Sequence, residues 1–233
     1  MIDVYCLPGT MCDERLWQQV EKYLPSDIHL VHVTYPVEAD LDALLNQLIE
    51  RLPKTPFHIL GFSLGGYLVS ELARLIPERL ASAIIISNAA SSLPDSERQQ
   101  RLQALSWVEN VGYKGIPTKK ARAMLYPKLE APDALVACIK DMDNAVGEAA
   151  FIAQLKATLD RRDNHDAIAK TSCNWMLLFG LYDQFVNLKA VGGLKALTNV
   201  TIHSVSNCGH MLPLEQPKWM ASKLQQFYSQ NNR

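Results

Sequence analysis

The chain has 233 residues, of which 48% are apolar, and its formal net charge at pH 7 is −1. This length and apolar content predict one well-buried domain carrying an insertion, and not two independent domains. The near-zero charge and the absence of a dense basic block argue against a nucleic-acid partner. No apolar run approaches the roughly 20 residues that span a bilayer, and Met1 leads into a strand-like run without a basic leader, so we expect a cytoplasmic protein.

Short apolar, β-branched runs alternate with helical patterns along most of the chain. The strand-like runs lie at 2–8, 28–35, 57–62, 82–88, 174–180 and 200–205. The helical patterns lie at about 13–24, 40–52, 64–76, 187–197 and 215–230. This alternation predicts an α/β fold with a mostly parallel sheet of about six strands and helices on both faces. Ligand-binding loops would then gather at the carboxyl edge of the sheet.

Residues 91–165 interrupt this alternation, because they show helical periodicity at 96–108, 119–125 and 134–159 but no convincing strand. We therefore divide the chain into a core of 1–90 and 166–233 and a helical lid of 91–165, inserted between the fourth and fifth strands. Apolar lid residues could line an acyl pocket, although each could instead belong to the lid's own core. These residues are Leu102, Leu105, Trp107, Tyr113, Met124, Leu125 and Tyr126.

Ser63 lies in Gly61-Phe62-Ser63-Leu64-Gly65, directly after the strand-like run 57–62 and directly before the helical pattern 64–76. A serine that projects from such a tight strand-to-helix turn needs neighbours without a Cβ, which the two glycines supply. The start of the following helix would also aim backbone N–H groups at negative charge that forms beside the hydroxyl. The pattern therefore predicts that Ser63 is a nucleophile.

A serine hydroxyl needs an imidazole to accept its proton and a carboxylate to orient that imidazole. Asp183 and His210 each follow a strand-like run through a short loop, in the order that such a site requires. The other histidines are weaker candidates, because they lie inside strand-like runs or, for His165, in a charged stretch typical of a solvated linker. They are His29, His32, His58, His165 and His203. The five cysteines form no C-x-x-C pair, and no cluster has metal-ligand spacing, so we expect reduced thiols, no metal and no cofactor.

These motifs resemble those of the α/β-hydrolase superfamily, in which the chain order is also serine, acid, histidine. The resemblance rests on Leu7-Pro8-Gly9-Thr10, Gly61 to Gly66, Gly180 to Asp183, and Gly209-His210 through Pro217. Within the superfamily the chain looks most like small lidded bacterial carboxylesterases of the pimeloyl-carrier-protein methyl ester esterase type. The resemblance implies an oxyanion hole made by the N–H groups of Thr10 and Leu64. Pro8 replaces the usual histidine of that loop, which leaves Met11 as an alternative donor.

We interpret the protein as a serine hydrolase of carboxylic esters, or of thioesters, that acts through an acyl-enzyme on a small-molecule substrate. Residues expected to contact the substrate are Met11, Trp107, Tyr113, Met124, Tyr126, Phe185 and Met211. A C–C bond lyase of the menaquinone-pathway type remains an alternative, although such relatives usually carry an arginine where this chain has Tyr67. A peptidase of the proline iminopeptidase type and a non-enzymatic receptor that keeps the fold also remain open. The sequence leaves the oligomeric state undetermined.

Overall fold

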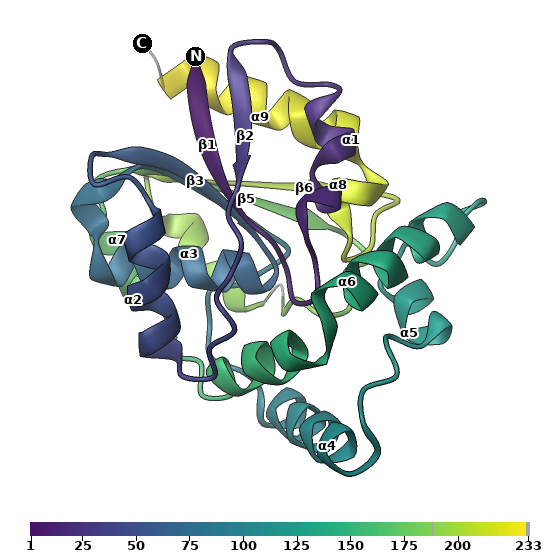
Figure 1. Ribbon diagram of the computed structural model, residues 1–233. Coiled ribbons are helices and arrows are strands. Elements are labelled where there is room, and N and C mark those ends of the chain that lie inside the picture. Colours follow the sequence, from purple (N-terminus) through teal and green to yellow (C-terminus); the bar gives the residue numbers. More distant parts are fainter. Residues whose placement is uncertain (188, 232–233) are drawn as a thin grey trace.

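The computed structural model describes residues 1–187 and 189–231 and is built on a six-stranded parallel sheet (Figure 1). Its strands are β1 (Ile2–Leu7), β2 (Ile28–His32), β3 (Phe57–Phe62), β4 (Leu80–Ile86), β5 (Asn174–Gly180) and β6 (Val200–Val205). They lie in the order β2-β1-β3-β4-β5-β6, and every neighbouring pair is parallel. The predicted α/β fold is confirmed, and β3, β5 and β6 have the predicted bounds.

The order of the strands brings the ends of β1 and β3 together. The chain moves from β1 outward to β2 and then returns to place β3 on the other side of β1. Leu7, the last residue of β1, pairs with Gly61 near the end of β3. The loops that follow these two strands therefore start side by side, which is where open α/β sheets bind their ligands.

Helices cover both faces of the sheet (Figure 1). They are α1 (Gln18–Glu21), α2 (Leu41–Arg51), α3 (Leu64–Leu75), α7 (His165–Lys170), α8 (Leu212–Glu215) and α9 (Pro217–Asn231). Alternate side chains of each strand point to opposite faces. On β3, Ile59 packs with residues of α2 and α3, whereas Leu60 packs with residues of α1 and α9. The sheet is thus buried on both faces, as its continuous apolar runs predict.

Two predicted helices have a different form in the structure. The helical pattern at 13–24 is divided into a 3₁₀ turn, Glu14–Leu16, and the short α1. The pattern at 187–197 forms a 3₁₀ helix at Ala190–Ala196, and residue 188 lies outside the described residues. Gly192 and Gly193 disfavour an α-helix there, because glycine loses more backbone freedom than other residues when it becomes helical.

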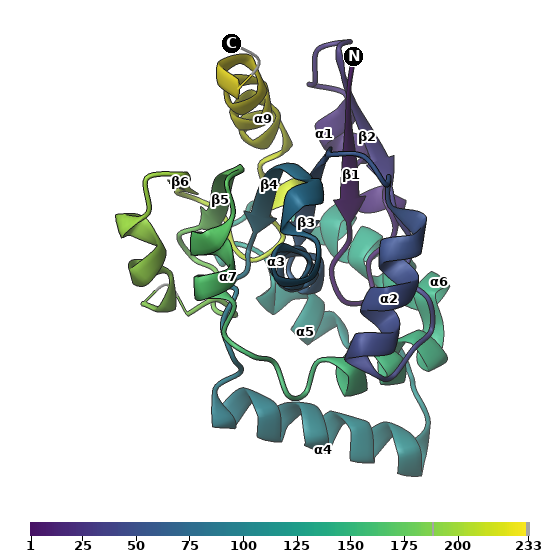
Figure 2. The same ribbon diagram turned by 90° about the vertical axis from the view of Figure 1, so that its left-hand side faces the viewer.

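Three helices precede α7 in the chain between β4 and β5, and α4 lies farthest from the sheet (Figure 2). They are α4 (Asp95–Val111), α5 (Thr118–Ala123) and α6 (Asp133–Ala157), the last of which is kinked at Gly147 with φ 81°. Leu125 and Met142 belong to the same buried cluster as Phe62. Segment 91–165 therefore shares a core with the sheet.

The structure corrects the expectation for His165, at the end of this segment. Its charged stretch predicts a solvated linker, but His165 begins α7, whose Ile168 is fully buried against α3. Its ring is partly buried, and Nε2 lies 2.8 Å from the carbonyl oxygen of Ala89. A single buried residue per turn gives too weak a periodic signal to distinguish such a short helix from a charged loop.

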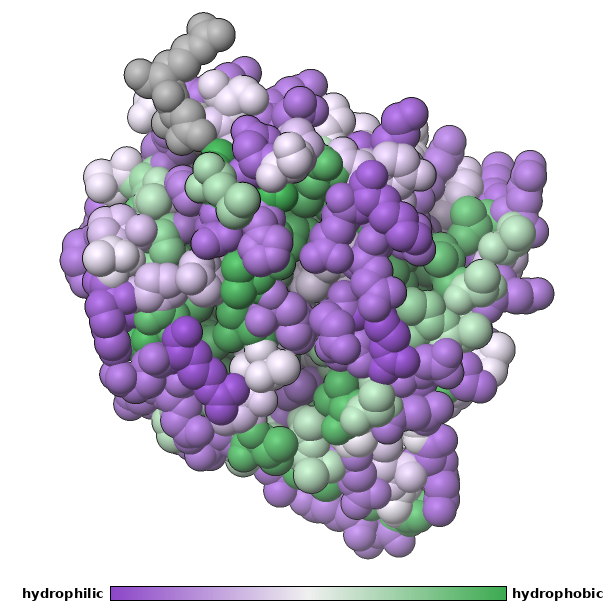
Figure 3. Space-filling view, turned by 45° about the horizontal axis from the view of Figure 1, so that its top comes forward, coloured by the Kyte–Doolittle hydropathy of each residue, from purple (hydrophilic) through white to green (hydrophobic). Residues whose placement is uncertain are grey.

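The surface is mostly polar on the face shown in Figure 3, where apolar areas are small and separated by hydrophilic residues.

Among residues 1–187 and 189–231, no helix is both long enough and apolar enough to cross a bilayer. All five cysteines are free thiols, and four of them are buried.

Candidate active site

Ser63 lies at a strained turn between β3 and α3. Its backbone has φ 51° and ψ −111°, a region that residues with a Cβ rarely adopt. The flanking glycines are required by close backbone approach: a Cβ on Gly65 would lie 2.1 Å from the oxygen of Leu7, and one on Gly61 would lie 2.2 Å from the oxygen of Gly65. The Ser63 N–H donates to the carbonyl of Ile86 at 2.8 Å, which holds the turn against β4.

His210 and Asp183 meet Ser63 at the carboxyl edge of the sheet. His210 Nε2 lies 3.0 Å from Ser63 Oγ, and His210 Nδ1 lies 2.8 Å from Asp183 Oδ2. The Asp183 side chain is fully buried, and His210 is 6% exposed. Because a carboxylate only accepts hydrogen bonds, it fixes the proton on Nδ1 and leaves the Nε2 lone pair facing the serine hydroxyl.

Each partner is held by contacts from other loops. Asp183 Oδ1 accepts the N–H of Phe185 at 2.8 Å, and Ser87 Oγ donates to the carbonyl of His210 at 2.9 Å. The imidazole packs against the rings of Phe62 and Phe185, with centroid separations of 5.2 and 5.1 Å. Two aromatic contacts therefore restrain the ring of His210. Sequence reasoning missed Phe62 and Ser87, because neither carries a signal that separates it from a core residue.

The loop after β1 lies directly against Ser63. Gly65 N–H donates to the Pro8 carbonyl at 3.0 Å, and a Cβ on Gly9 would lie 3.3 Å from the Cβ of Ser63. The N–H of Met11 donates to Oε1 of Gln154 in α6 at 3.0 Å, so it is already engaged. Within the described residues the N–H groups of Thr10 and Leu64 have no acceptor. Of the two donors considered for this loop, the geometry favours Thr10.

The sequence pattern of the α/β hydrolase fold matches residues 8–217 of this chain. The chain belongs to this family. Monoacylglycerol lipase ABHD6 of Bos taurus is 24% identical over 251 residues, covering 96% of this chain and 74% of the lipase. The biotin biosynthesis bifunctional protein BioHC of Cellvibrio japonicus (strain Ueda107) is 27% identical over 94% of this chain and 46% of its own length.

Solved structures agree with the fold of this hydrolase-family chain. A thermophilic esterase from Thermogutta terrifontis superimposes with a TM-score of 0.81 over 100% of this chain and 91% of the esterase, at 19% identity. A similarity at this level of identity concerns the fold alone. The sequence-based recognition of the α/β-hydrolase superfamily is confirmed, and the relatives agree with the prediction of an esterase-like hydrolase.

Not all residues expected to contact a substrate lie near Ser63. Met11 and Met211 are buried in the loops beside Ser63 and His210, and Phe185 packs on His210. Met124 and Tyr126 follow α5. The Met124 carbonyl accepts the N–H of His210, and the N–H of Tyr126 donates to Glu215, which also accepts the N–H of Gly209.

The structure contradicts the placement of Trp107 in a pocket, because its side chain is 64% exposed. Leu105 and Val108 turn inward on α4, so Ser106 and Trp107, which lie between them, face solvent. Tyr113 stacks on Phe151 and donates its hydroxyl proton to Asp143, so its contacts lie within segment 91–165.

The titratable groups around the hydrolase site do not offer a rival nucleophile. Burial raises the pKa of the Cys12 thiol to about 12, and it raises the pKa of Cys208 further. Both thiols are therefore protonated at neutral pH and act as small apolar fillers, as the sequence indicates. Burial also raises the pKa of the Glu215 carboxyl, although N–H groups of neighbouring residues oppose this shift. Among residues 1–187 and 189–231, no group of three or more His, Cys, Asp or Glu side chains is arranged to hold a metal ion.

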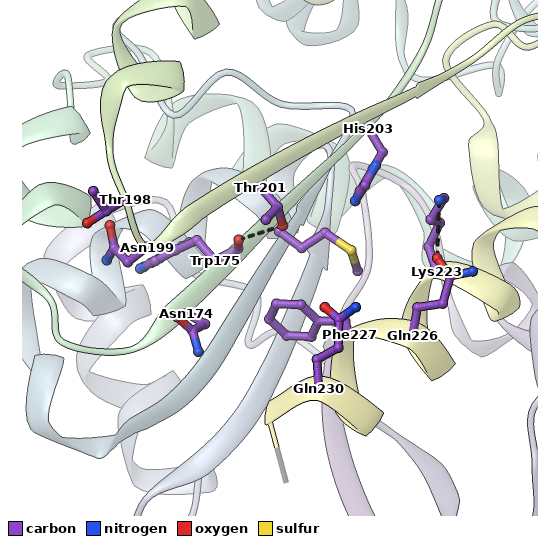
Figure 4. A pocket seen from close by; sticks show the side chains of 11 residues that line it. Asn174, Trp175, Thr198, Asn199, Thr201, His203, Lys223, Gln226, Phe227 and Gln230 are labelled. Carbon is purple, nitrogen blue, oxygen red and sulfur yellow. Dashed lines mark hydrogen bonds between the residues drawn. The ribbon is translucent and has the colours of Figure 1, made fainter. Parts of the chain in front are cut away.

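Two hollows on the surface of the described residues are lined by other side chains than Ser63, Asp183 and His210. One, of about 240 Å³, opens beside α9 near the amino-terminal ends of β5 and β6 (Figure 4). Ser63 lies at the other, carboxyl edge of the sheet. This hollow is lined by polar side chains that include Asn199, His203 and Lys223. The other, of about 380 Å³, lies where Tyr126 and Leu129 approach Asn207 and Gln216.

Proposed function

We propose that this α/β-hydrolase cleaves carboxylic esters, with thioesters as a second substrate class, through an acyl-enzyme on Ser63. The observation that carries the proposal is the buried imidazole of His210, hydrogen-bonded at once to Asp183 at 2.8 Å and to Ser63 at 3.0 Å. A hydrogen-bonded arrangement of nucleophile, base and orienting acid is what serine acyl transfer requires. Relatives that are lipases and esterases support the substrate class.

The proposed reaction has two steps. Ser63 Oγ attacks the acyl carbon while His210 Nε2 accepts its proton, and the Thr10 and Leu64 N–H groups hold the oxyanion. His210 then protonates the departing alcohol or thiol, which leaves the acyl group on Ser63. In the second step His210 takes a proton from water, the hydroxide attacks the acyl carbon, and Ser63 recovers its proton as the acid departs. Asp183 stabilises the imidazolium in both steps.

Segment 91–165 is proposed to act as the lid of this site. Gln154 in α6 contacts the loop of Thr10 and Met11, and Met124 contacts His210, so the segment touches the site at two points. A cover of this kind excludes water and strengthens electrostatic interactions with the developing oxyanion. Apolar side chains on its inner face would favour apolar acyl groups.

The alternative of a C–C bond lyase loses support at Tyr67. Its hydroxyl donates to the buried Glu71 on the same helix at 2.5 Å, and its side chain is fully buried. The position that would carry a cation for an anionic substrate is therefore occupied by a core residue.

The test is a rate series on p-nitrophenyl esters from acetate to decanoate, with a carrier-protein thioester alongside. We expect hydrolysis with a preferred chain length, and we expect Ser63→Ala to lose at least about 10³-fold in kcat because the nucleophile is gone. Ser91→Ala is the control, since Ser91 lies in the loop after β4 and outside the hydrogen-bonded group. Retention of activity in Ser63→Ala would refute the proposal.

A further inference from the structure

Glu215, at the end of α8, joins two segments of the chain that are far apart in sequence. Its Oε2 accepts the N–H of Tyr126 at 2.6 Å, and both carboxylate oxygens accept the N–H of Gly209, at 3.0 and 3.1 Å. Next to this contact, the N–H of His210 donates to the carbonyl of Met124 at 2.7 Å. Two neighbouring peptide groups of the turn 124–126 are thus hydrogen-bonded, one directly and one through Glu215, to His210 and Gly209.

Backbone atoms approach one another closely around this junction. A Cβ on Gly209 would lie 2.7 Å from backbone atoms of Leu125 and Met124, so only glycine permits the approach. Leu125 is 1% exposed and belongs to the main core. The ring of Tyr126 packs edge-on against Tyr182, next to Asp183, at a centroid distance of 4.8 Å. The turn 124–126 therefore contacts the loops of both proposed partners of Ser63.

The two N–H groups that point at Glu215 are better satisfied by a carboxylate than by an amide. An ionised carboxylate accepts hydrogen bonds at both oxygens and can receive the two converging N–H groups together. A glutamine has one acceptor oxygen, and its NH₂ group would face an N–H donor. Glu215 forms no salt bridge within the described residues, so its partly buried charge is stabilised by backbone N–H groups. A charge of this kind is costly to bury unless its hydrogen bonds are made.

We propose that Glu215 is a positioning residue for the hydrolase reaction: it locks the turn 124–126 to Gly209 and thereby fixes the imidazole of His210 against Ser63. The inference rests on the proposed function, since it assigns a role relative to the proposed base. It also makes the end of α5 part of the catalytic scaffold, while the rest of segment 91–165 covers the site. Motion of α5 would displace His210, so substrate contact with the lid and activation of Ser63 are coupled.

The test compares Glu215→Gln with Glu148→Gln. Glu148 also accepts a backbone N–H, that of Tyr113 at 2.8 Å, but it does not contact the His210 loop. We expect Glu215→Gln to lower kcat on p-nitrophenyl butyrate by about 10- to 10²-fold with KM within about twofold, because small misplacements of a catalytic group have effects of this size. Labelling of Ser63 by a fluorophosphonate should slow in proportion. Glu148→Gln should retain kcat at a comparable Tm.

Three outcomes overturn the inference: full kcat in folded Glu215→Gln, a loss confined to KM, or an equal kcat loss in Glu148→Gln. If Glu215→Gln does not fold, hydrogen exchange on the wild-type protein decides. The amides of Tyr126, Gly209 and His210 should gain protection together when the probe occupies Ser63, and independent exchange overturns the inference. Labelling of Ser63 in the wild type tests the proposed function separately.

Discussion

Helical periodicity predicts both α3 and α4 in the sequence, yet the two helices have different roles in the molecule. Ten of the twelve residues of α3, Leu64 to Ala73, are buried, whereas in the seventeen residues of α4 only Leu105 and Val108 are buried. Helix α3 is enclosed by β1, β3, β4 and α7, and Ser63 directly precedes its first residue. The difference indicates that Ser63, the proposed nucleophile, is held by the buried core, while the exposed residues of α4 can vary at small cost.

The largest effect is expected for a change at the carboxyl edge of the sheet, where α3 begins. If Asp183 orients His210, Asp183→Asn should keep the fold and KM but lower kcat by up to about 10⁴-fold, as found for the serine-protease acid. Steady-state kinetics and a thermal melt measure this. Asp163→Asn is the control, because Asp163 is exposed and contacts the N–H and the ring of His165, which lies outside the hydrogen-bonded group of Ser63, His210 and Asp183. Full turnover in Asp183→Asn would show that the acid is assigned wrongly.

The next effect concerns the packing of α3. Gly65→Ala would place a Cβ 2.1 Å from the Leu7 oxygen, a backbone atom that cannot turn aside. We expect a loss of about 3 kcal/mol or more in the free energy of unfolding, measured in urea, together with loss of activity. Gly192→Ala, where no heavy atom lies within 4 Å of the added Cβ, should change stability by less than about 0.5 kcal/mol. Similar stabilities for the two variants would contradict the comparison.

Smaller effects are expected on α4. Trp107→Ala should change stability by less than about 0.5 kcal/mol, because the side chain is 64% exposed. It should also leave the chain-length profile of p-nitrophenyl esters unchanged. Leu105→Ala, at a site 5% exposed, should cost about 2 kcal/mol or more. A shifted chain-length profile in Trp107→Ala would show that Trp107 contacts the acyl chain despite its exposed position.

The same contrast explains what the sequence could predict. The strands could be predicted because buried parallel strands are continuous apolar runs, and the tight turn at Ser63 could be predicted because it needs glycines at fixed spacing. The face of Trp107 could not be read, since α4 has too few buried residues to define a stripe. Contacts such as Gln154 with Met11, or Glu215 with Tyr126, join residues 143 and 89 positions apart. Nothing local specifies which distant backbone group a polar side chain will meet.

The smallest effect is a pH dependence that should arise from the sheet region and not from α4, which contains no histidine. Burial lowers the pKa of His58 below its ordinary value of 6.5, and its Nδ1 lies 2.8 Å from Ser82 Oγ. A lowered folded-state pKa gives a contribution to stability that is present above pH 6.5 and is lost as the pH falls through the folded pKa. Burial has the same effect on the pKa of His32.

Urea unfolding measured between pH 8 and pH 5 should therefore show a decline that is shallower in His58→Gln than in the wild type. His29→Gln serves as the control, since the His29 side chain is 63% exposed beside Asp3. An unchanged slope in His58→Gln would remove this histidine as a source of the acid sensitivity.

The most direct test of the account is to locate the adduct of a fluorophosphonate probe by peptide mass spectrometry. Ser63 is the serine at a positive-φ turn whose Oγ lies 3.0 Å from a histidine nitrogen, so the account predicts a single stoichiometric adduct on Ser63. Labelling should be absent in Ser63→Ala and much slower in His210→Gln. An adduct on Ser87 or Ser91, or undiminished labelling in His210→Gln, would contradict the account.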